Sequence, residues 1–257
     1  MYVSIDNLKI NFEIFGKGEP ILLLHGWGGS LESLKTLAKQ LSTRSLQLIL
    51  LDLPGFGKTL SPREDFSLDD YADLVEKFLK LQKIDDLYVF GHSFGGAIAI
   101  KLAVRKTIKI RKLILCNSSG IRQSDSGKQL AISGAVKKLF SLPLLRSIYP
   151  SIRKFFYYYI LRNRDYIDHQ EIAGTFQRVV GEDITSILKE VQVPTLLLWG
   201  ELDMDTPLSH GKIMHSKIQN SRLQVIKGAS HGLPKIEPEI VQKEMMKFIN
   251  QAIIPAV

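Results

Sequence analysis

The sequence predicts an α/β fold in which a mostly parallel sheet carries helices on both faces. Strand-like apolar runs alternate with helix-like amphipathic runs along most of the 257 residues, a pattern typical of parallel sheets. Several strand-like runs are apolar without interruption, as expected for strands that are buried on both faces. A composition of 45% hydrophobic and 23% charged residues is that of a globular chain with a substantial core.

The first quarter of the chain opens with two segments of alternating polarity, residues 2–5 and 8–15, which predict two strands joined by a turn at Asp6-Asn7. The continuous apolar run PILLLHG (20–26) predicts a buried strand. Residues 30–41 place Leu and Ala on one helical stripe, so we expect a helix there.

The next elements continue the alternation. LQLILLDLPGFG (46–57) predicts a buried strand that runs into a Pro-Gly turn, and residues 67–81 predict a helix. Ser67 stands three residues before Asp70, which is close to a capping box with a shorter acid than usual. We expect a strand at 86–91, a helix directly after it at 95–106, and a strand at 112–117.

The alternation stops from about residue 121 to residue 191, where short amphipathic pieces and two prolines replace the buried strand-like runs. It returns with strand-like runs at 193–200 and 222–228 and a final helix at about 238–252. We therefore predict a core formed by residues 1–120 and 191–257, interrupted by a helical insertion at residues 121–190.

Bulk properties narrow the class of protein. The single cysteine, Cys116, excludes a disulfide framework within the chain, and no stretch resembles a signal peptide or the roughly 18 apolar residues of a spanning helix. We expect a cytoplasmic protein without an integral membrane segment. The net charge is +8, but no zinc-ligand spacing, RNA-binding signature, phosphate-binding glycine loop or metal cluster accompanies it. No nucleic-acid partner, metal or cofactor is implied.

The stretch GHSFG (91–95) matches the pattern G-x-S-x-G and lies between a predicted strand and a predicted helix. Ser93 would stand at a sharp turn, where bulky side chains two residues away would collide with the strand and the helix. The helix N-terminus also favours negative charge that develops beside it. This context indicates that Ser93 is a nucleophile.

A serine nucleophile needs a base, and the base needs an acid to orient it. Among six histidines, His231 in GASHG follows the last predicted strand, whereas His92 adjoins the serine and should point away from it. Asp203 and Asp205 follow the strand-like run LLLWG, at the edge where such sheets place catalysis. The chain order Ser93, Asp203, His231 is the order nucleophile, acid, base.

These residues resemble the α/β-hydrolase superfamily, in particular its capped serine esterase and C–C hydrolase branch. The resemblance rests on LLLHGWGG, LDLPGFGKT, GHSFGG, WGELDMDTP and GASHG. It implies an α/β-hydrolase fold: a mostly parallel eight-stranded sheet flanked by helices, with the insertion as a helical cap. The family places its acid three residues after a strand-end glycine, and Gly200 and Asp203 match this spacing, which favours Asp203 over Asp205. Some members take the acid from an earlier strand, but Asn117 stands there and cannot act as a carboxylate.

The resemblance also implies an oxyanion hole formed by the backbone N–H groups of Trp27 and Phe94. We therefore expect a serine hydrolase that cleaves small-molecule carboxylic esters through an acyl-enzyme intermediate, with catalytic Ser93, Asp203 and His231. Two alternatives remain: a C–C bond hydrolase or related lyase on the same triad, and a ligand receptor built on the hydrolase fold. His25 should support the oxyanion loop, and Asp52 should stabilise its own turn.

The predicted insertion is basic and aromatic. Residues 133–164 contain seven lysines and arginines, no acidic residue and seven Phe or Tyr side chains. Solvated faces of amphipathic helices account for this pattern; an entrance that attracts anionic substrates, or contact with an anionic membrane surface, are the alternatives.

Overall fold

The computed structural model describes residues 1–42, 45–122 and 172–251. Within them an eight-stranded sheet runs in the order β1-β2-β4-β3-β5-β6-β7-β8. The strands are β1 (Tyr2–Ile5), β2 (Leu8–Gly16), β3 (Glu19–Leu24), β4 (Leu46–Leu51), β5 (Asp86–His92), β6 (Lys109–Cys116), β7 (Thr195–Gly200) and β8 (Ser221–Ile226). β2 is antiparallel to β1 and β4, and the remaining neighbours are parallel. The predicted fold is confirmed.

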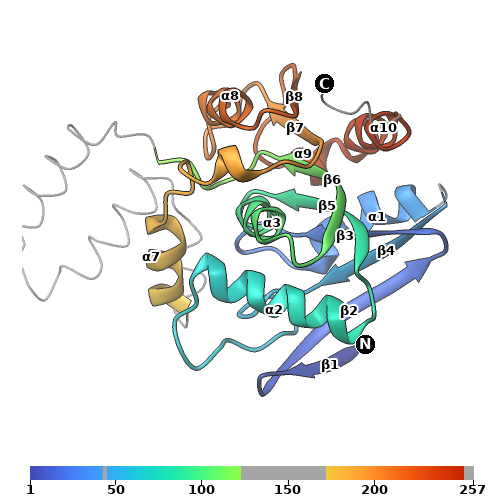
Figure 1. Cartoon of the computed structure of the whole chain (residues 1–257), viewed down its shortest axis with the longest axis vertical. Coiled ribbons are helices and arrows are strands. Elements are labelled where there is room, and N and C mark those ends of the chain that lie inside the picture. The colour runs from blue at the N-terminus through green and yellow to red at the C-terminus, as the bar shows by residue number, and fades with distance from the viewer. Residues whose placement is uncertain (43–44, 123–171, 252–257) are drawn as a thin grey trace, which may run out of the picture.

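Helices cover both faces of this sheet (Figure 1). The larger core lies beneath α2 (Leu68–Leu81), α3 (Phe94–Arg105) and α8 (Leu208–Lys217). The core on the opposite face lies beneath α1 (Lys35–Ser42), α9 (Leu233–Ile236) and α10 (Pro238–Ile249). The sheet therefore brings the carboxyl ends of its parallel strands to one edge, between two layers of helices.

Two helix starts show how the local sequence sets the boundaries. The capping box at α2 is confirmed: the Ser67 N–H donates to Asp70 Oδ2 at 2.7 Å, and the Asp70 N–H donates to Ser67 Oγ at 3.3 Å. The helix expected at 30–41 begins instead as a short 3₁₀ turn, η1 (Leu31–Leu34), before α1.

Helix α8 is absent from the sequence prediction because its apolar stripe is sparse. Its buried residues are Gly211 and Met214. A Cβ added to Gly211 would lie 2.7 Å from the Trp199 ring, so the helix packs its backbone, rather than a row of large side chains, against the sheet. A pattern search for amphipathic stripes does not detect such a contact.

The predicted insertion falls mainly on residues 123–171, which lie outside the described residues, as does the basic stretch 133–164. Described parts of the predicted insertion are α7 (Ala173–Gly181) and η5 (Leu188–Glu190). The flanks of the undescribed stretch lie side by side, because the Ile184 N–H donates to the Gly120 carbonyl at 2.9 Å and Arg122 Nε donates to the Val180 carbonyl at 2.9 Å. The division into core and cap stays a prediction.

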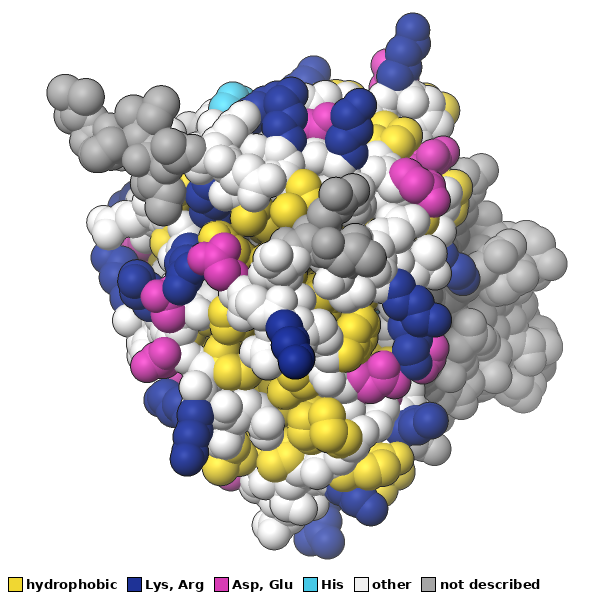
Figure 2. All heavy atoms as spheres, turned by 90° about the vertical axis from the view of Figure 1, so that its right-hand side faces the viewer, with side chains coloured by type: hydrophobic (Ala, Val, Ile, Leu, Met, Phe, Trp, Pro, Cys, Tyr) yellow, Lys and Arg dark blue, Asp and Glu magenta, His cyan; other side chains and the backbone are white. Residues whose placement is uncertain are grey.

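The face of the molecule that carries α1 and α10 shows Lys and Arg interspersed with Asp and Glu (Figure 2). The two signs of charge are mixed over this face rather than gathered into separate patches (Figure 2). None of the helices in the described ranges is both long enough and apolar enough to span a bilayer.

Candidate active site

Ser93 occupies a sharp turn between β5 and α3, with φ 50° and ψ −115°. A non-glycine residue in this region is strained by roughly 1–3 kcal/mol, and such strain persists only where the surroundings impose it. The flanking glycines show how it is imposed. A Cβ on Gly91 would lie 2.4 Å from the Gly95 carbonyl oxygen, and a Cβ on Gly95 would lie 2.4 Å from the Leu24 carbonyl oxygen. β5 thus lies against the start of α3, and the start of α3 lies against the end of β3, so closely that the serine is presented at the tip of the turn.

The turn is also held by backbone hydrogen bonds. The Ser93 N–H donates to the Cys116 carbonyl at 3.0 Å, and the Ser93 carbonyl accepts the Ser119 N–H at 3.0 Å. Cys116 is the last residue of the neighbouring strand β6, and Ser119 lies in the segment that follows it. Ser93 is therefore fixed relative to the carboxyl edge of the sheet.

The structure brings Ser93, His231 and Asp203 together. His231 Nε2 lies 3.0 Å from Ser93 Oγ, and His231 Nδ1 lies 2.9 Å from Asp203 Oδ2 and 3.1 Å from Oδ1. When Nδ1 carries the proton and donates to the carboxylate, Nε2 is free to accept the serine hydroxyl. These three residues, 138 and 28 positions apart in the chain, can therefore form one continuous hydrogen-bonded path.

The Asp203 carboxylate is buried, with 4% of the residue exposed. Burial by itself raises its pKa, but the hydrogen bond and charge of His231 and two hydrogen bonds from Thr206 outweigh burial, so the pKa of Asp203 lies below its ordinary value. Asp203 therefore stays a carboxylate at neutral pH and favours a positive charge on the imidazole.

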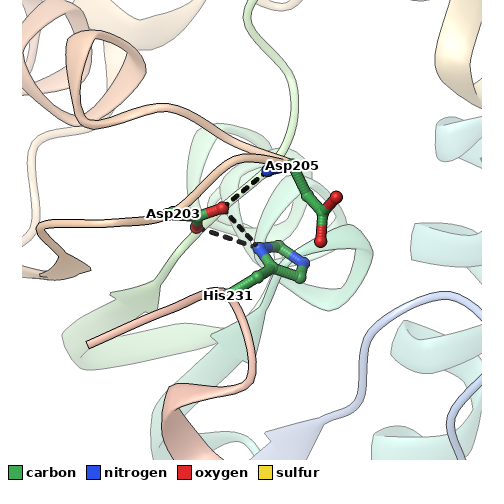
Figure 3. Close-up of side chains that lie close together, drawn as sticks. All are labelled: Asp203, Asp205 and His231. Carbon is green, nitrogen blue, oxygen red and sulfur yellow. Dashed lines mark hydrogen bonds and ion pairs between the residues drawn. The ribbon is translucent and has the colours of Figure 1, made fainter. Parts of the chain in front are cut away.

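Asp205 has a different role from Asp203 in this loop. Its backbone N–H donates to Asp203 Oδ1 at 2.9 Å, while its own side chain is exposed. In Figure 3 the Asp203 carboxylate points at the imidazole of His231, whereas the Asp205 carboxylate points away from Asp203. Asp203 is thus the carboxylate that hydrogen bonds to His231 Nδ1.

Asp203, Asp205 and His231 are also close enough to offer three ligand atoms to a metal ion, since these atoms lie within 4.8 Å of one another. Both oxygens of Asp203 already accept hydrogen bonds, from the backbone of Asp205 and Thr206 and from the side chains of Thr206 and His231. These hydrogen bonds account for the position of the Asp203 carboxylate beside His231.

The two backbone groups expected to form the oxyanion hole lie at loop and helix starts. Phe94 is the first residue of α3, so its N–H has no acceptor within the helix. Trp27 follows β3, next to Gly28, which adopts a φ of 69°. Its side chain packs edge-on against Phe94 and against Phe176 of α7, with ring centroids 5.3 and 5.0 Å apart. The C-terminal part of the predicted insertion thus directly contacts the loop that is expected to supply the Trp27 oxyanion donor.

His25 and Asp52 support this loop. His25 is fully buried, which lowers its pKa; its Nδ1 donates to the Gly26 carbonyl at 2.8 Å and its Nε2 accepts the Leu53 N–H at 3.1 Å. Asp52 accepts three hydrogen bonds, from Leu31 N–H, Lys58 N–H and Asn11 Nδ2.

Two residues of the site were not predicted from the sequence. Thr206 Oγ1 lies 2.8 Å from Asp203 Oδ2 and 3.3 Å from His231 Nδ1. Asn117, which the sequence offers only as a residue that cannot be the acid, hydrogen bonds to the loop that carries His231. A polar residue that follows a buried strand is the available signal for Asn117, and a hydroxyl three residues after an aspartate is the signal for Thr206.

Comparison with known proteins places the chain in a family. Residues 19–139 match a family model described as alpha/beta hydrolase fold, and residues 176–257 match one described as TAP-like protein. The chain is 26% identical to the AB hydrolase superfamily protein YisY of Bacillus subtilis, over 95% of this chain and 97% of that protein.

It is 28% identical to a pimeloyl-[acyl-carrier protein] methyl ester esterase of Legionella pneumophila, over 87% of this chain and 92% of the esterase. Among solved structures, a membrane phospholipase A described as a bacterial virulence factor superposes with a TM-score of 0.78 at 23% identity, over 97% of this chain and 85% of that one. The matches in sequence and the shared fold agree with the geometry of the site: the chain belongs to the α/β-hydrolase superfamily.

Proposed function

We propose that this chain is a serine hydrolase that cleaves carboxylic esters of small molecules through an acyl-enzyme intermediate. The observation that carries the proposal is the strained Ser93 with its Oγ 3.0 Å from His231 Nε2, on an imidazole whose other nitrogen is 2.9 Å from a buried carboxylate. A relative of 28% identity carries the name of a methyl ester esterase, which supports an ester as the substrate class.

The reaction follows from these contacts. Ser93 Oγ attacks the ester carbonyl carbon while its proton passes to His231 Nε2, and Asp203 stabilises the imidazolium. The carbonyl oxygen becomes an oxyanion that the N–H groups of Phe94 and Trp27 receive. Collapse of this intermediate breaks the bond to the alcohol, which takes the proton from His231.

Hydrolysis of the acyl-enzyme uses the same groups in reverse. Water attacks the acyl carbon, His231 removes its proton, and Ser93 is released with its proton restored. The electrostatic part of the site acts throughout: the N-terminus of α3 and the oxyanion donors stabilise negative charge, and losing one such donor typically costs roughly 3 kcal/mol of transition-state stabilisation.

The test is labelling with a fluorophosphonate probe together with turnover of p-nitrophenyl acetate, butyrate and octanoate, in the native chain and in Ser93→Ala. We expect labelling and ester turnover that both depend on Ser93, with a chain-length profile that measures the acyl pocket. Labelling without ester turnover would direct attention to the C–C bond hydrolase. A folded protein that neither labels nor turns over would contradict the proposal and favour the ligand receptor.

A further inference from the structure

The backbone carbonyl of His231 is held by two side chains that come from other strands. Asn117 Nδ2 lies 2.9 Å from this oxygen, and His92 Nε2 also lies 2.9 Å from it. Asn117 directly follows β6, and His92 is the last residue of β5. Two donors from two neighbouring strands thus converge on the backbone of the candidate catalytic base.

Asn117 connects three parts of the site through one amide group. Its Oδ1 accepts the Gly200 N–H at 2.8 Å, at the end of β7, and its Nδ2 donates to the Ser230 carbonyl at 3.0 Å as well as to His231. The residue is fully buried and has a φ of 45°. One N–H faces the oxygen of the Asn117 amide and two carbonyls face its nitrogen, so the orientation of the amide is determined. Neither Asp nor Leu at this position could hydrogen bond to the N–H and to both carbonyls.

His92 supplies the second donor in its neutral form. Burial, and after it the proximity of His231, lower the pKa of His92 to about 4, so the ring is neutral at pH 7. A neutral imidazole that donates from Nε2 leaves Nδ1 without a proton. His92 is therefore a fixed donor at neutral pH, and it does not compete with His231 for a proton.

The loop that carries His231 must keep the imidazole in a defined position. It follows the edge strand β8 and includes Gly228, which has a φ of 72° and open space around it. The imidazole must meet Ser93 and Asp203 at once, and a displacement of about 1 Å in such a site can reduce turnover about 100-fold.

We propose that Asn117 and His92 are positioning residues. Their hydrogen bonds to the His231 backbone keep its imidazole within hydrogen-bond distance of both Ser93 and Asp203. The expected effect on turnover rests on the proposed ester hydrolysis, whereas the positioning of His231 does not.

The first test compares His92→Leu with His92→Gln, since the Gln amide can reach the position of Nε2 and retain a donor. We expect His92→Leu to reduce kcat roughly 10- to 100-fold with KM within about two-fold, because the imidazole is misplaced while substrate binding is not. His92→Gln should restore most of this loss. Equal kcat in the native chain and folded His92→Leu, within about two-fold, would overturn the role of His92.

Asn117→Asp tests the other donor with a side chain of the same shape. The new carboxylate would face the carbonyls of Ser230 and His231, so kcat should fall at neutral pH, and the ratio to native kcat should rise as the pH is lowered and the carboxyl regains a hydrogen to donate. Thr195→Val is the control, because Thr195 is also a buried donor to a backbone carbonyl, that of Val193 at 2.9 Å, and lies at the start of β7, at the opposite end of the strand from Gly200; its kcat should match native. A constant ratio of kcat in Asn117→Asp to native across pH, close to one, would contradict the role of Asn117.

A third readout separates this inference from the proposed function. The proton on His231 Nδ1 that faces Asp203 should give a downfield ¹H resonance in the native protein, detectable without any substrate. We expect it to broaden or disappear in His92→Leu and in Asn117→Asp and to persist in His92→Gln and Thr195→Val. If the native chain hydrolyses no ester and this pattern is still seen, the proposed function fails and the positioning stands. An unchanged resonance in every variant would refute the positioning, whatever the activity.

Discussion

The low pKa of His92 predicts a specific loss of stability in acid. The ordinary pKa of histidine is 6.5, and that of the folded-state His92 is about 4, mainly because the ring is buried. Between these values the unfolded chain binds a proton that the folded chain does not, so folding stability falls as the pH is lowered through this window and is unaffected above about pH 6.5. A difference of 6.5 − 4, or about 2.5 pKa units, corresponds at most to about 3 kcal/mol, at 1.36 kcal/mol per unit.

His92→Gln removes this titration while it keeps a donor for the His231 carbonyl. The assay is urea unfolding of both proteins at pH 7, 6, 5 and 4.5, with the free energy of unfolding extrapolated to water. We expect the native protein to lose about 2 to 3 kcal/mol more than the variant between pH 7 and pH 4.5. The other groups that face His92, namely His25, His231 and Asp203, are present in both proteins and largely cancel. Parallel curves, within about 0.5 kcal/mol, would refute the reasoning.

Two further predictions use matched pairs. Asp203→Asn should lower kcat roughly 10⁴-fold, as expected when the imidazole loses its orienting carboxylate, whereas kcat of Asp205→Asn should stay within about two-fold of native. Ester turnover measures both variants, and equal losses of kcat would contradict the assignment of Asp203. Gly91→Ala should reduce the free energy of unfolding by about 3 kcal/mol or prevent folding, because its methyl would meet the backbone of the next helix at 2.4 Å. Gly181→Ala, which meets nothing within 4 Å, should raise it by up to about 1 kcal/mol, as denaturant unfolding will show.

The strands of the sheet could be predicted from the sequence because they are buried on both faces and their apolar runs have few interruptions. β3, β4 and β7 follow this rule: the side chains at 21–24, 48–51 and 196–199 are almost inaccessible to solvent. The helices differed in how clearly the sequence predicted them. α2 has a capping box and a full apolar stripe, whereas α8 packs through Gly211 against Trp199 and gives no periodic signal. Element type was therefore predictable where burial is continuous, and was missed where a helix packs through its backbone.

The proposed nucleophile could be predicted for a related reason. A Cβ at Gly91 would meet the backbone of α3, and a Cβ at Gly95 would meet the backbone at the end of β3. Both positions therefore require glycine, and this steric requirement appears directly in the sequence around Ser93. His25 and Asp52 were also interpreted as supports, because each follows a strand and adjoins a glycine turn. In each case the signal is local.

The two sides of His231 differ in how far their determinants lie along the chain. On the acid side, Asp203 accepts the backbone N–H groups of Asp205 and Thr206, two and three residues away, so one short loop folds around its own carboxylate and turns the second acid outward. That geometry is encoded within four residues, and for this reason spacing alone could favour Asp203. On the backbone side, His231 is held by Asn117 and His92, which stand 114 and 139 residues earlier. Their contacts exist only because β5, β6, β7 and β8 are successive neighbours in the sheet, and no pattern within one segment expresses strand order. The residues that perform the proposed chemistry can therefore be found by motif, whereas the residues that position His231 can be found only from the folded sheet.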